Sequence, residues 1–235
     1  MMWEIPRTTL LAAAILLALI PAATGSDLPP RTMALLNSKA LRVNDTIIFT
    51  KWTRAVTRHN LQVSMHTEPC ATPRNETCYL DEWRDVLQRL EKLPKRAQID
   101  AINKHMNASP YVLDIVNWGI TDYWETPLEF LMFAGDCEDF AIAKFFSLLR
   151  LGFSNDEMQI VIVQDQNLRV PHAVLAVTLD GTNYILDNQI PQVVPDTLIH
   201  HYTPYYGVNL TSWWRFSGKS NALTPDAIAP PRPTP

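Results

Sequence analysis

The sequence predicts an α+β fold in which a helical part comes first and an antiparallel sheet follows. Helical patterns with start and stop signals occupy most of residues 81–151, and three short strand-like runs follow between residues 158 and 186. Helices and strands that are segregated along the chain, rather than alternating, are typical of α+β domains. We therefore expect one domain over residues 81–218, in which the last of these helices packs on the sheet.

The composition is that of an ordinary globular protein. The chain has 235 residues, of which 47% are hydrophobic and 19% charged, so it is long enough to bury a sizeable core. The formal net charge of -4 provides no basic surface that would attract nucleic acid. Aromatic residues make up 9% of the chain, which argues against an acidic disordered protein.

The N-terminus has the layout of a secretory signal peptide over residues 1–25. A single basic residue, Arg7, precedes an uninterrupted apolar run over Leu10–Ile20, and small residues follow Pro21. The run is shorter than the ~20 residues that a spanning helix needs, which disfavours the alternative of an uncleaved membrane anchor. Cleavage is expected near Gly25–Ser26, so the mature protein is predicted to lie outside the cytoplasm.

Residues 26–80 are expected to form an N-terminal arm and a loop. Short apolar stretches occur within Leu35–Lys51, which we expect to be irregular. A helix is predicted over Asp81–Leu93, because apolar residues recur there at helical spacing between a capping Asp81 and the stop signal Pro94. A second amphipathic helix is predicted over Arg96–Met106.

Two further helices are predicted in the middle of the chain. Residues 107–122 are loop-like, and a short helix follows over Thr126–Phe133 with Pro127 in its first turn. Residues 135–139, Gly-Asp-Cys-Glu-Asp, then lead into a helix through Phe140–Leu151. Acidic residues crowd the first turn of this helix and a glycine follows its end, which are start and stop signals.

The strand-like runs come next, over Met158–Val163, Ala173–Leu179 and Asn183–Leu186. Asp180-Gly181 separates the last two runs and is a hairpin signal, so these runs should pair as antiparallel neighbours. Residues 219–235 end in a proline-rich stretch and are predicted to be a disordered tail.

The three cysteines fall into a pair and a single residue. Cys70 and Cys78 lie close together in a polar loop, where they can form a small disulfide in an oxidising compartment or remain two free thiols. Cys137 is left over. An odd cysteine in an exported protein indicates either an intermolecular bridge or a reactive thiol.

Cys137 stands where a helix is predicted to begin. Unpaired backbone N–H groups and the helix dipole at that position favour the thiolate, which is the reactive form. The flanking carboxylates of Asp136 and Glu138 oppose this, because like charges raise the pKa of a thiol unless a cation or a protonated histidine compensates them. The alternative is an inert cysteine that is buried in the core.

His172 and Asp187 supply the partners that a nucleophilic thiol needs. If the runs on either side of Asp180-Gly181 pair, their outer ends lie side by side, and these two residues are those ends. A carboxylate on one ring nitrogen fixes the tautomer of the imidazole and leaves the other nitrogen for the thiol. Asn188 is the fallback for Asp187, because side chains alternate along a strand and only one of the two should point at the histidine.

Three segments carry a resemblance to a known family. Gly135-Asp-Cys-Glu-Asp-Phe-Ala-Ile-Ala-Lys144, Pro171-His-Ala-Val-Leu-Ala-Val177 and Ile185-Leu-Asp-Asn188 are similar to the bacterial transglutaminase-like cysteine proteinases. The resemblance covers roughly residues 81–214 and implies a transglutaminase-like, papain-like fold. It also implies a Cys-His-Asp triad with Cys137 as nucleophile, His172 as base and Asp187 as the acid that orients the base.

The resemblance further implies a calcium-dependent enzyme. Asp136, Glu138 and Asp139 offer the hard oxygen ligands that Ca²⁺ prefers, and a bound cation would relieve the like charges around the thiol. Three carboxylates are fewer than the roughly 6–8 ligands of calcium, so backbone carbonyls, water and Asn117 are candidates to complete the shell. The alternative without metal is compensation of the helix dipole by Glu138 and Asp139.

The family resemblance gives the most specific functional expectation. It implies a periplasmic endopeptidase that cleaves the N-terminal region of a large surface adhesin, releases it and promotes biofilm dispersal, with an inner-membrane cyclic di-GMP receptor as inhibitory partner. Two alternatives stay open. One is a transglutaminase, which uses an amine in place of water and the same nucleophile; the other is a calcium-binding interaction module without catalysis, against which the complete candidate triad argues.

Overall fold

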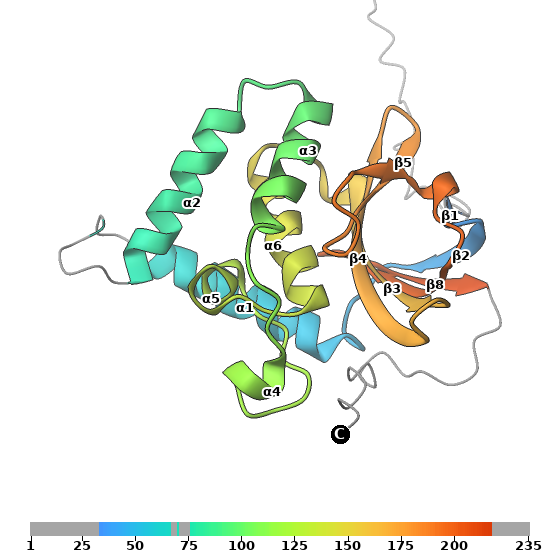
Figure 1. Ribbon diagram of the computed structural model, residues 1–235, viewed down its shortest axis with the longest axis horizontal. Coiled ribbons are helices and arrows are strands. Elements are labelled where there is room, and N and C mark those ends of the chain that lie inside the picture. Colours follow the sequence, from blue (N-terminus) through green and yellow to red (C-terminus); the bar gives the residue numbers. More distant parts are fainter. Residues whose placement is uncertain (1–32, 67–69, 71–75, 218–235) are drawn as a thin grey trace, which may run out of the picture.

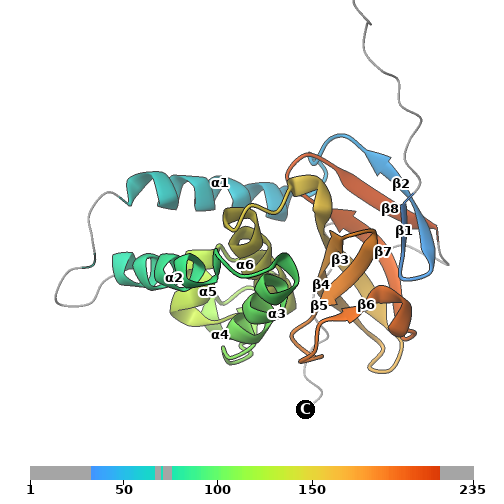
Figure 2. The ribbon, with the colours of Figure 1, turned by 90° about the horizontal axis from the view of Figure 1, so that it is seen from above.

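The computed structural model describes residues 33–66, 70 and 76–217. Helices gather on one side and the strands form a curled sheet on the other, as Figure 1 and Figure 2 show from two directions. The predicted signal peptide over residues 1–25 and the predicted tail over residues 219–235 lie outside the described residues. Within the described part, no helix is long and apolar enough to cross a membrane.

The helical elements precede most of the strands, so the α+β prediction is confirmed. The helices in chain order are α1 (Thr50–Met65), α2 (Glu76–Leu90), α3 (Lys95–Met106), α4 (Asp114–Asn117), α5 (Pro127–Phe133) and α6 (Cys137–Arg150), with short 3-10 turns at Asn155–Glu157 and Asp196–Leu198. The strands are β1 (Met33–Leu35), β2 (Ser38–Val43), β3 (Met158–Asp165), β4 (Val170–Leu179), β5 (Thr182–Leu186), β6 (Val194–Pro195), β7 (Tyr202–Val208) and β8 (Trp213–Ser217).

The described strands make one antiparallel sheet with the order β1-β2-β8-β7-β3-β4-β5-β6. The predicted hairpin between β4 and β5 is confirmed, and Leu179 pairs with Thr182 across its turn. Asp180 and Gly181 both have positive φ values, 51° and 78°, as a two-residue turn of the primed type requires. This hairpin fixes the relative position of the two strand ends on which the candidate site depends.

The helices that lead to the site begin and end as the sequence signals predict. At the start of α5, Thr126 Oγ1 accepts a hydrogen bond from the Glu129 N–H at 3.2 Å, and Glu129 Oε2 accepts one from the Thr126 N–H at 2.8 Å. Gly152 follows α6 with a φ of +81°, a left-handed conformation that glycine adopts without strain.

The expectation of an irregular arm over Leu35–Lys51 is wrong. Strand β2 lies in this region and β1 ends where it begins, and β2 pairs with β8, so the sheet starts well before residue 81. The strands at the end of the chain that complete this pairing, β7 and β8, are also absent from the prediction. Helix α1 is a further omission: its buried residues Trp52, Ala55 and His59 recur at helical spacing, but polar residues dominate the segment and conceal the pattern.

The first predicted helix is also placed too late. Helix α2 begins at Glu76, so Asp81 lies inside it and is no N-cap. The Asp81 carboxylate instead accepts hydrogen bonds from His66 Nε2 at 2.9 Å and from the Cys70 N–H at 2.7 Å. These contacts fasten the start of α2, where Cys70 and Cys78 form a disulfide.

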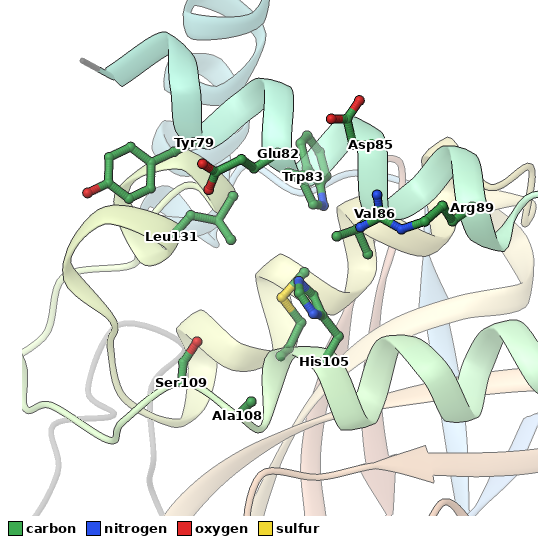
Figure 3. Close-up of a pocket in the computed structure, with 11 residues that line it drawn as sticks. Tyr79, Glu82, Trp83, Asp85, Val86, Arg89, His105, Ala108, Ser109 and Leu131 are labelled. Atoms are coloured by element: carbon green, nitrogen blue, oxygen red, sulfur yellow. The ribbon is translucent and has the colours of Figure 1, made fainter. Parts of the chain in front are cut away.

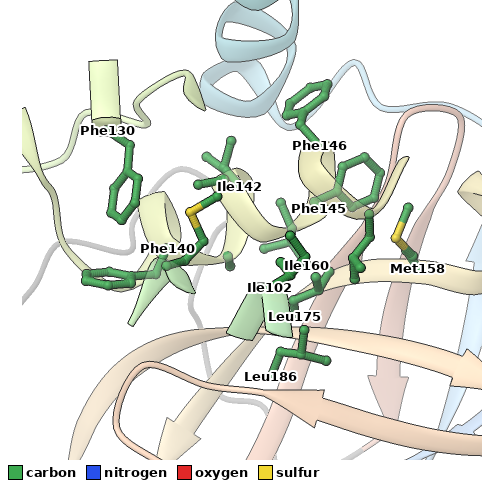
Figure 4. Close-up of a cluster of buried hydrophobic side chains, with 14 of the residues drawn as sticks. Ile102, Phe130, Phe140, Ile142, Phe145, Phe146, Met158, Ile160, Leu175 and Leu186 are labelled. Carbon is green, nitrogen blue, oxygen red and sulfur yellow. The ribbon is translucent and has the colours of Figure 1, made fainter. Parts of the chain in front are cut away.

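Two hydrophobic clusters lie on opposite faces of the sheet. Ile160 and Leu175 point toward the helices and join a large cluster that includes much of α6, as Figure 4 shows. Ile162 belongs to the same cluster. Their neighbours Val161 and Val174 point the other way, into a second cluster with Trp214, Phe216 and β1. The central strands are therefore buried on both faces, which explains why they read as continuous apolar runs.

His59 makes the stability of this helical layer depend on pH. Its ring lies 4.0 Å from the Phe146 ring, and burial, followed by the charge of Arg150, lowers its pKa to about 4. Between about pH 6.5 and 4, His59 therefore binds a proton in the unfolded chain but not in the folded chain. The free energy of unfolding falls as pH falls through this window. We expect wild type to lose about 3 kcal/mol more than His59→Phe between pH 7 and 4, as measured by urea unfolding.

Candidate active site

The N-terminus of α6 holds Cys137 in a fixed position. Asp139 organises this turn, because its Oδ2 accepts a hydrogen bond from the Asp136 N–H at 2.9 Å and its Oδ1 accepts one from the Glu125 N–H at 2.8 Å. A Cβ at position 135 would lie 2.2 Å from Asp139 Oδ2, so only glycine fits before the cap. The motif Gly135-Asp136-Cys137 is thus a requirement of the local packing.

The thiol of Cys137 is held in its protonated form. It donates a hydrogen bond to Glu138 Oε2 at 3.1 Å. Burial raises the pKa of this thiol well above its usual value, and the carboxylates of Glu138 and Asp136 raise it further, while the N–H of Ala173 acts in the opposite direction. The like-charge problem anticipated from the sequence is therefore present in the fold.

His172 lies inside β4, two residues after its start, and Asp187 directly follows the last residue of β5. The register pairs Leu175 with Leu186, which brings His172 and Asp187 together. His172 Nε2 lies 2.9 Å from Asp187 Oδ1, and Asp187 Oδ2 accepts a hydrogen bond from Tyr202 Oη at 2.7 Å. Burial alone would raise the pKa of Asp187, but the hydrogen bonds, first that from His172, hold it below its usual value.

These contacts define the state of the imidazole. An ionised Asp187 only accepts hydrogen bonds, so Nε2 of His172 carries a proton and Nδ1 has a free lone pair when the ring is neutral. The sequence offers Asn188 as a fallback, but the carboxylate that contacts the ring belongs to Asp187.

The structure brings the candidate nucleophile to the same place as this pair. The N–H of Ala173, the residue after His172, donates a hydrogen bond to the Cys137 sulfur. The thiol itself donates to Glu138, however, and Nδ1 of His172 contacts Gln189 Nε2 at 3.3 Å. The backbone of Ala173 thus links the thiol to the strand that carries His172, and the thiol and the imidazole each have a different side-chain partner.

A buried cluster of carboxylates surrounds the N-terminus of α6. Its members are Asp114, Asp122, Glu125, Asp136, Glu138 and Asp139. Three overlapping sets bring ligand atoms within 4.8 Å of one another: Asp136 with Cys137 and Glu138; Asp114 with Glu125 and Asp139; and Asp114 with Asp122 and Glu138. The Lys51 ammonium forms an ion pair with Asp122 at the side of the cluster.

Several oxygens of this carboxylate cluster are buried without a hydrogen-bond partner among the described residues. They are both Oδ atoms of Asp136, Oδ1 of Asp114 and Asp122, Oε2 of Glu125 and Oε1 of Glu138. Burial, followed by the charge of Asp136, raises the pKa of Asp114 to about 7, and burial raises the pKa of Glu125 to about 8. Buried carboxylates that lack partners and repel one another are what a divalent cation with oxygen preference would stabilise, so these residues fit calcium.

The predicted calcium ligands differ in whether their oxygens already accept hydrogen bonds. Asp136 and Glu138 have unpartnered oxygens, whereas both Asp139 oxygens accept backbone hydrogen bonds, as the helix-capping alternative requires. Asn117 donates its amide to the carbonyl of Ala134 at 2.7 Å and serves to fix α4.

Three members of the carboxylate cluster were not predicted from the sequence: Asp114 and Asp122, which lie in the segment predicted to be loop-like, and Glu125, which follows it. One signal was available: Asp114 stands within the apolar stretch Tyr111-Val-Leu-Asp-Ile-Val116, and a charged residue in such a context is seldom buried unless it is paired. Trp124, beside Glu125 in the chain, belongs to the hydrophobic core.

The cavity shown in Figure 3 lies elsewhere in the molecule. It has a volume of about 480 Å³ and lies between α2, α3 and α5, where Trp83, Val86, Met106 and Leu131 line it together with charged residues such as Arg89. Neither Cys137, His172 nor Asp187 lines this cavity. The candidate site is therefore identified by its chemistry and not by the size of a cavity.

Comparisons with known proteins agree with this geometry. Residues 57–213 match the model of the bacterial transglutaminase-like cysteine proteinases. Among solved structures, LapG from Legionella pneumophila is 24% identical with a TM-score of 0.55, covering 74% of this chain and 90% of that chain. Its calcium-bound form is also 24% identical with a TM-score of 0.55, covering 75% and 91%.

The two LapG structures show that the fold is shared, and no curated protein matches the chain. The family match extends over most of the chain and includes Cys137, His172 and Asp187. The chain therefore belongs to the family of bacterial transglutaminase-like cysteine proteinases.

Proposed function

We propose that this cysteine proteinase is a calcium-dependent endopeptidase with Cys137 as nucleophile, His172 as base and Asp187 as the residue that orients the base. The observation that carries the proposal is the 2.9 Å contact between His172 Nε2 and Asp187 Oδ1, beside a cysteine at a helix N-terminus. This arrangement leaves Nδ1 of the imidazole available for a thiol.

The proposed reaction is acyl transfer to water. Nδ1 of His172 takes the proton of Cys137, and the sulfur attacks the peptide carbonyl. The imidazolium, stabilised by Asp187, then gives the same proton to the leaving amine. Water, deprotonated by Nδ1, cleaves the thioester and restores the thiol. Backbone N–H groups at the start of α6 are the candidates for stabilising the oxyanion.

Calcium would be held by the carboxylate cluster around Asp136, Glu138, Asp114 and Asp122. Its contribution when bound is positive charge beside the thiol, which lowers the pKa of Cys137 and neutralises the carboxylates. The calcium-bound LapG structure supports this metal, and the unpartnered carboxylate oxygens support it independently. Asp139 keeps its capping role and shapes the turn that presents the ligands.

We further propose the biological setting that the resemblance implies. The predicted signal peptide over residues 1–25 would direct the protein to the periplasm. There it would cleave a large surface adhesin near its N-terminus, release it and promote biofilm dispersal. An inner-membrane cyclic di-GMP receptor would inhibit it by binding. The family match and the fold shared with LapG support the cysteine proteinase itself, and the setting follows from the family resemblance of the sequence.

The proposed function is tested by incubating an N-terminal adhesin fragment with the protein lacking residues 1–25, with and without a calcium chelator, beside Cys137→Ala. We expect two fragments only with untreated wild type. Fragment masses that add up to the substrate plus one water exclude the transglutaminase alternative, which would give a heavier crosslinked product. Cleavage by Cys137→Ala would overturn the assignment of the nucleophile.

Exposed apolar side chains beside the nucleophile suit a polypeptide substrate. The group consists of Tyr111, Ile115, Val116, Ile120 and Phe133. The backbone of this segment is joined to that of the nucleophile turn, because the Val112 N–H donates to the Gly135 carbonyl at 2.9 Å. A substrate that buries one such side chain gains about 1.5 kcal/mol of binding free energy. Val116→Ser should therefore raise KM for the adhesin fragment about tenfold at unchanged kcat.

The matched control for Val116→Ser is Leu61→Ser on α1, which removes another exposed apolar side chain from the described surface. We expect its KM to equal that of wild type. Equal KM values for all three proteins would show that the substrate does not cover these side chains.

A further inference from the structure

The nitrogen of His172 that must receive the thiol proton is already occupied. Gln189 Nε2 lies 3.3 Å from His172 Nδ1. Because the Asp187 contact places the ring proton on Nε2, Nδ1 of the neutral ring is an acceptor and the Gln189 amide is its donor. The Gln189 side chain thus caps the lone pair on which the proposed base function depends.

The position of Gln189 follows from the β4–β5 hairpin. Extending the register beyond the pair Leu175–Leu186 places residue 189 opposite residue 172. The Gln189 N–H also donates a hydrogen bond to Asp187 Oδ1 at 2.8 Å, so its backbone is anchored to the acid while its side chain contacts the base. The residue as a whole is exposed, whereas His172 is buried, so the side chain can turn away into solvent.

The thiol is restrained in a corresponding way, because Cys137 donates its hydrogen bond to Glu138. Formation of a thiolate–imidazolium pair therefore requires two exchanges, in which the thiol leaves Glu138 and the Gln189 amide leaves Nδ1. An amide N–H cannot donate to a nitrogen that has gained a proton, so the Gln189 contact must break before Nδ1 can take the thiol proton.

We propose that Gln189 is a positioning residue that caps Nδ1 of His172 until the thiol displaces the amide. The proposal rests on the proposed function, because it assigns a residue to the same site.

The test uses the reactivity of Cys137 toward iodoacetamide at saturating calcium. No substrate is required, and cleavage assays run in parallel show separately whether the proposed function fails. A single hydrogen bond to a neutral acceptor corresponds to about a fivefold effect. Gln189→Ala should therefore alkylate about fivefold faster than wild type at neutral pH, with equal rates at high pH where the thiol is ionised in both proteins.

Two further variants show that the effect acts through the imidazole. In a His172→Asn background, adding Gln189→Ala should change the alkylation rate less than twofold. Gln166→Ala is the matched control, since Gln166 is also exposed and uses its amide on Thr203 Oγ1 at 3.1 Å. Its rate should equal that of wild type. An unchanged or slower rate in Gln189→Ala, or the same acceleration without His172, would overturn the proposal.

Discussion

Replacing Cys137 with alanine is expected to reduce peptide-bond hydrolysis by roughly 10⁴-fold or more, because no other described group at the site can form the thioester. His172→Ala should have an effect of similar size, and the two changes together should cost little more than either alone, since the residues act as one unit. The measurement is kcat for the adhesin fragment at saturating calcium.

The fold should survive these changes. Cys137 is only partly buried, and its thiol donates one hydrogen bond to Glu138 and accepts one from the Ala173 N–H, so Cys137→Ala is expected to unfold within a few degrees of wild type. Asp187→Asn is the most informative single change at the acid. It keeps the shape of the side chain but offers His172 Nε2 an amide in place of a carboxylate, so kcat is expected to fall roughly 10⁴-fold. A double variant whose loss equals the product of the single losses would contradict a shared mechanism.

Removing calcium is expected to have the second largest effect, on both activity and stability. Without a cation the carboxylate cluster holds buried like charges, and the pKa of Cys137 is raised well above its usual value. At a free calcium concentration about 100 times Kd, an ion that binds only the folded state adds about 2.7 kcal/mol to the free energy of unfolding. For a domain of this size that corresponds to about 5–10 °C in Tm, which thermal unfolding with and without chelator measures.

The same experiment distinguishes the members of the cluster. Asp114→Asn and Asp136→Asn should each reduce the calcium-induced rise in Tm, because each removes a charge with an unpartnered oxygen. Asp156→Asn is the control: this exposed aspartate pairs with Arg42 at 2.7 Å outside the cluster, and its rise in Tm should match that of wild type. If the chelator left both activity and Tm of wild type unchanged, Glu138 and Asp139 would be helix-capping residues and nothing more.

The sequence predicts the elements whose signals are local. Helix α5 is indicated by Pro127 in its first turn, the end of α6 by Gly152, and the β4–β5 turn by Asp180-Gly181, and each signal determines backbone geometry within a few residues. Strand β2 could not be found in this way. It is short and half-exposed, and its partner β8 lies about 170 residues further along the chain, so only the completed sheet selects it.

The candidate site likewise combines residues that local signals indicate with residues that no local signal indicates. His172 and Asp187 were found because one tight hairpin joins them, and Cys137 because it begins a helix. Asp114, Asp122 and Tyr202 reach the site from separate segments, and nothing local marks them as neighbours of α6 or of Asp187. Gln189 was missed because its role depends on the rotation of one exposed amide.

The most direct test of the account is the alkylation rate of Cys137 by iodoacetamide at neutral pH, with calcium and with a chelator. The chain has three cysteines, and two of them form a disulfide, so the reagent reports on Cys137 alone. Each unit by which calcium lowers the pKa of the thiol increases the thiolate about tenfold. The account predicts a rate at least about tenfold faster with calcium, and equal rates would contradict the proposal that a cation among these carboxylates activates the nucleophile.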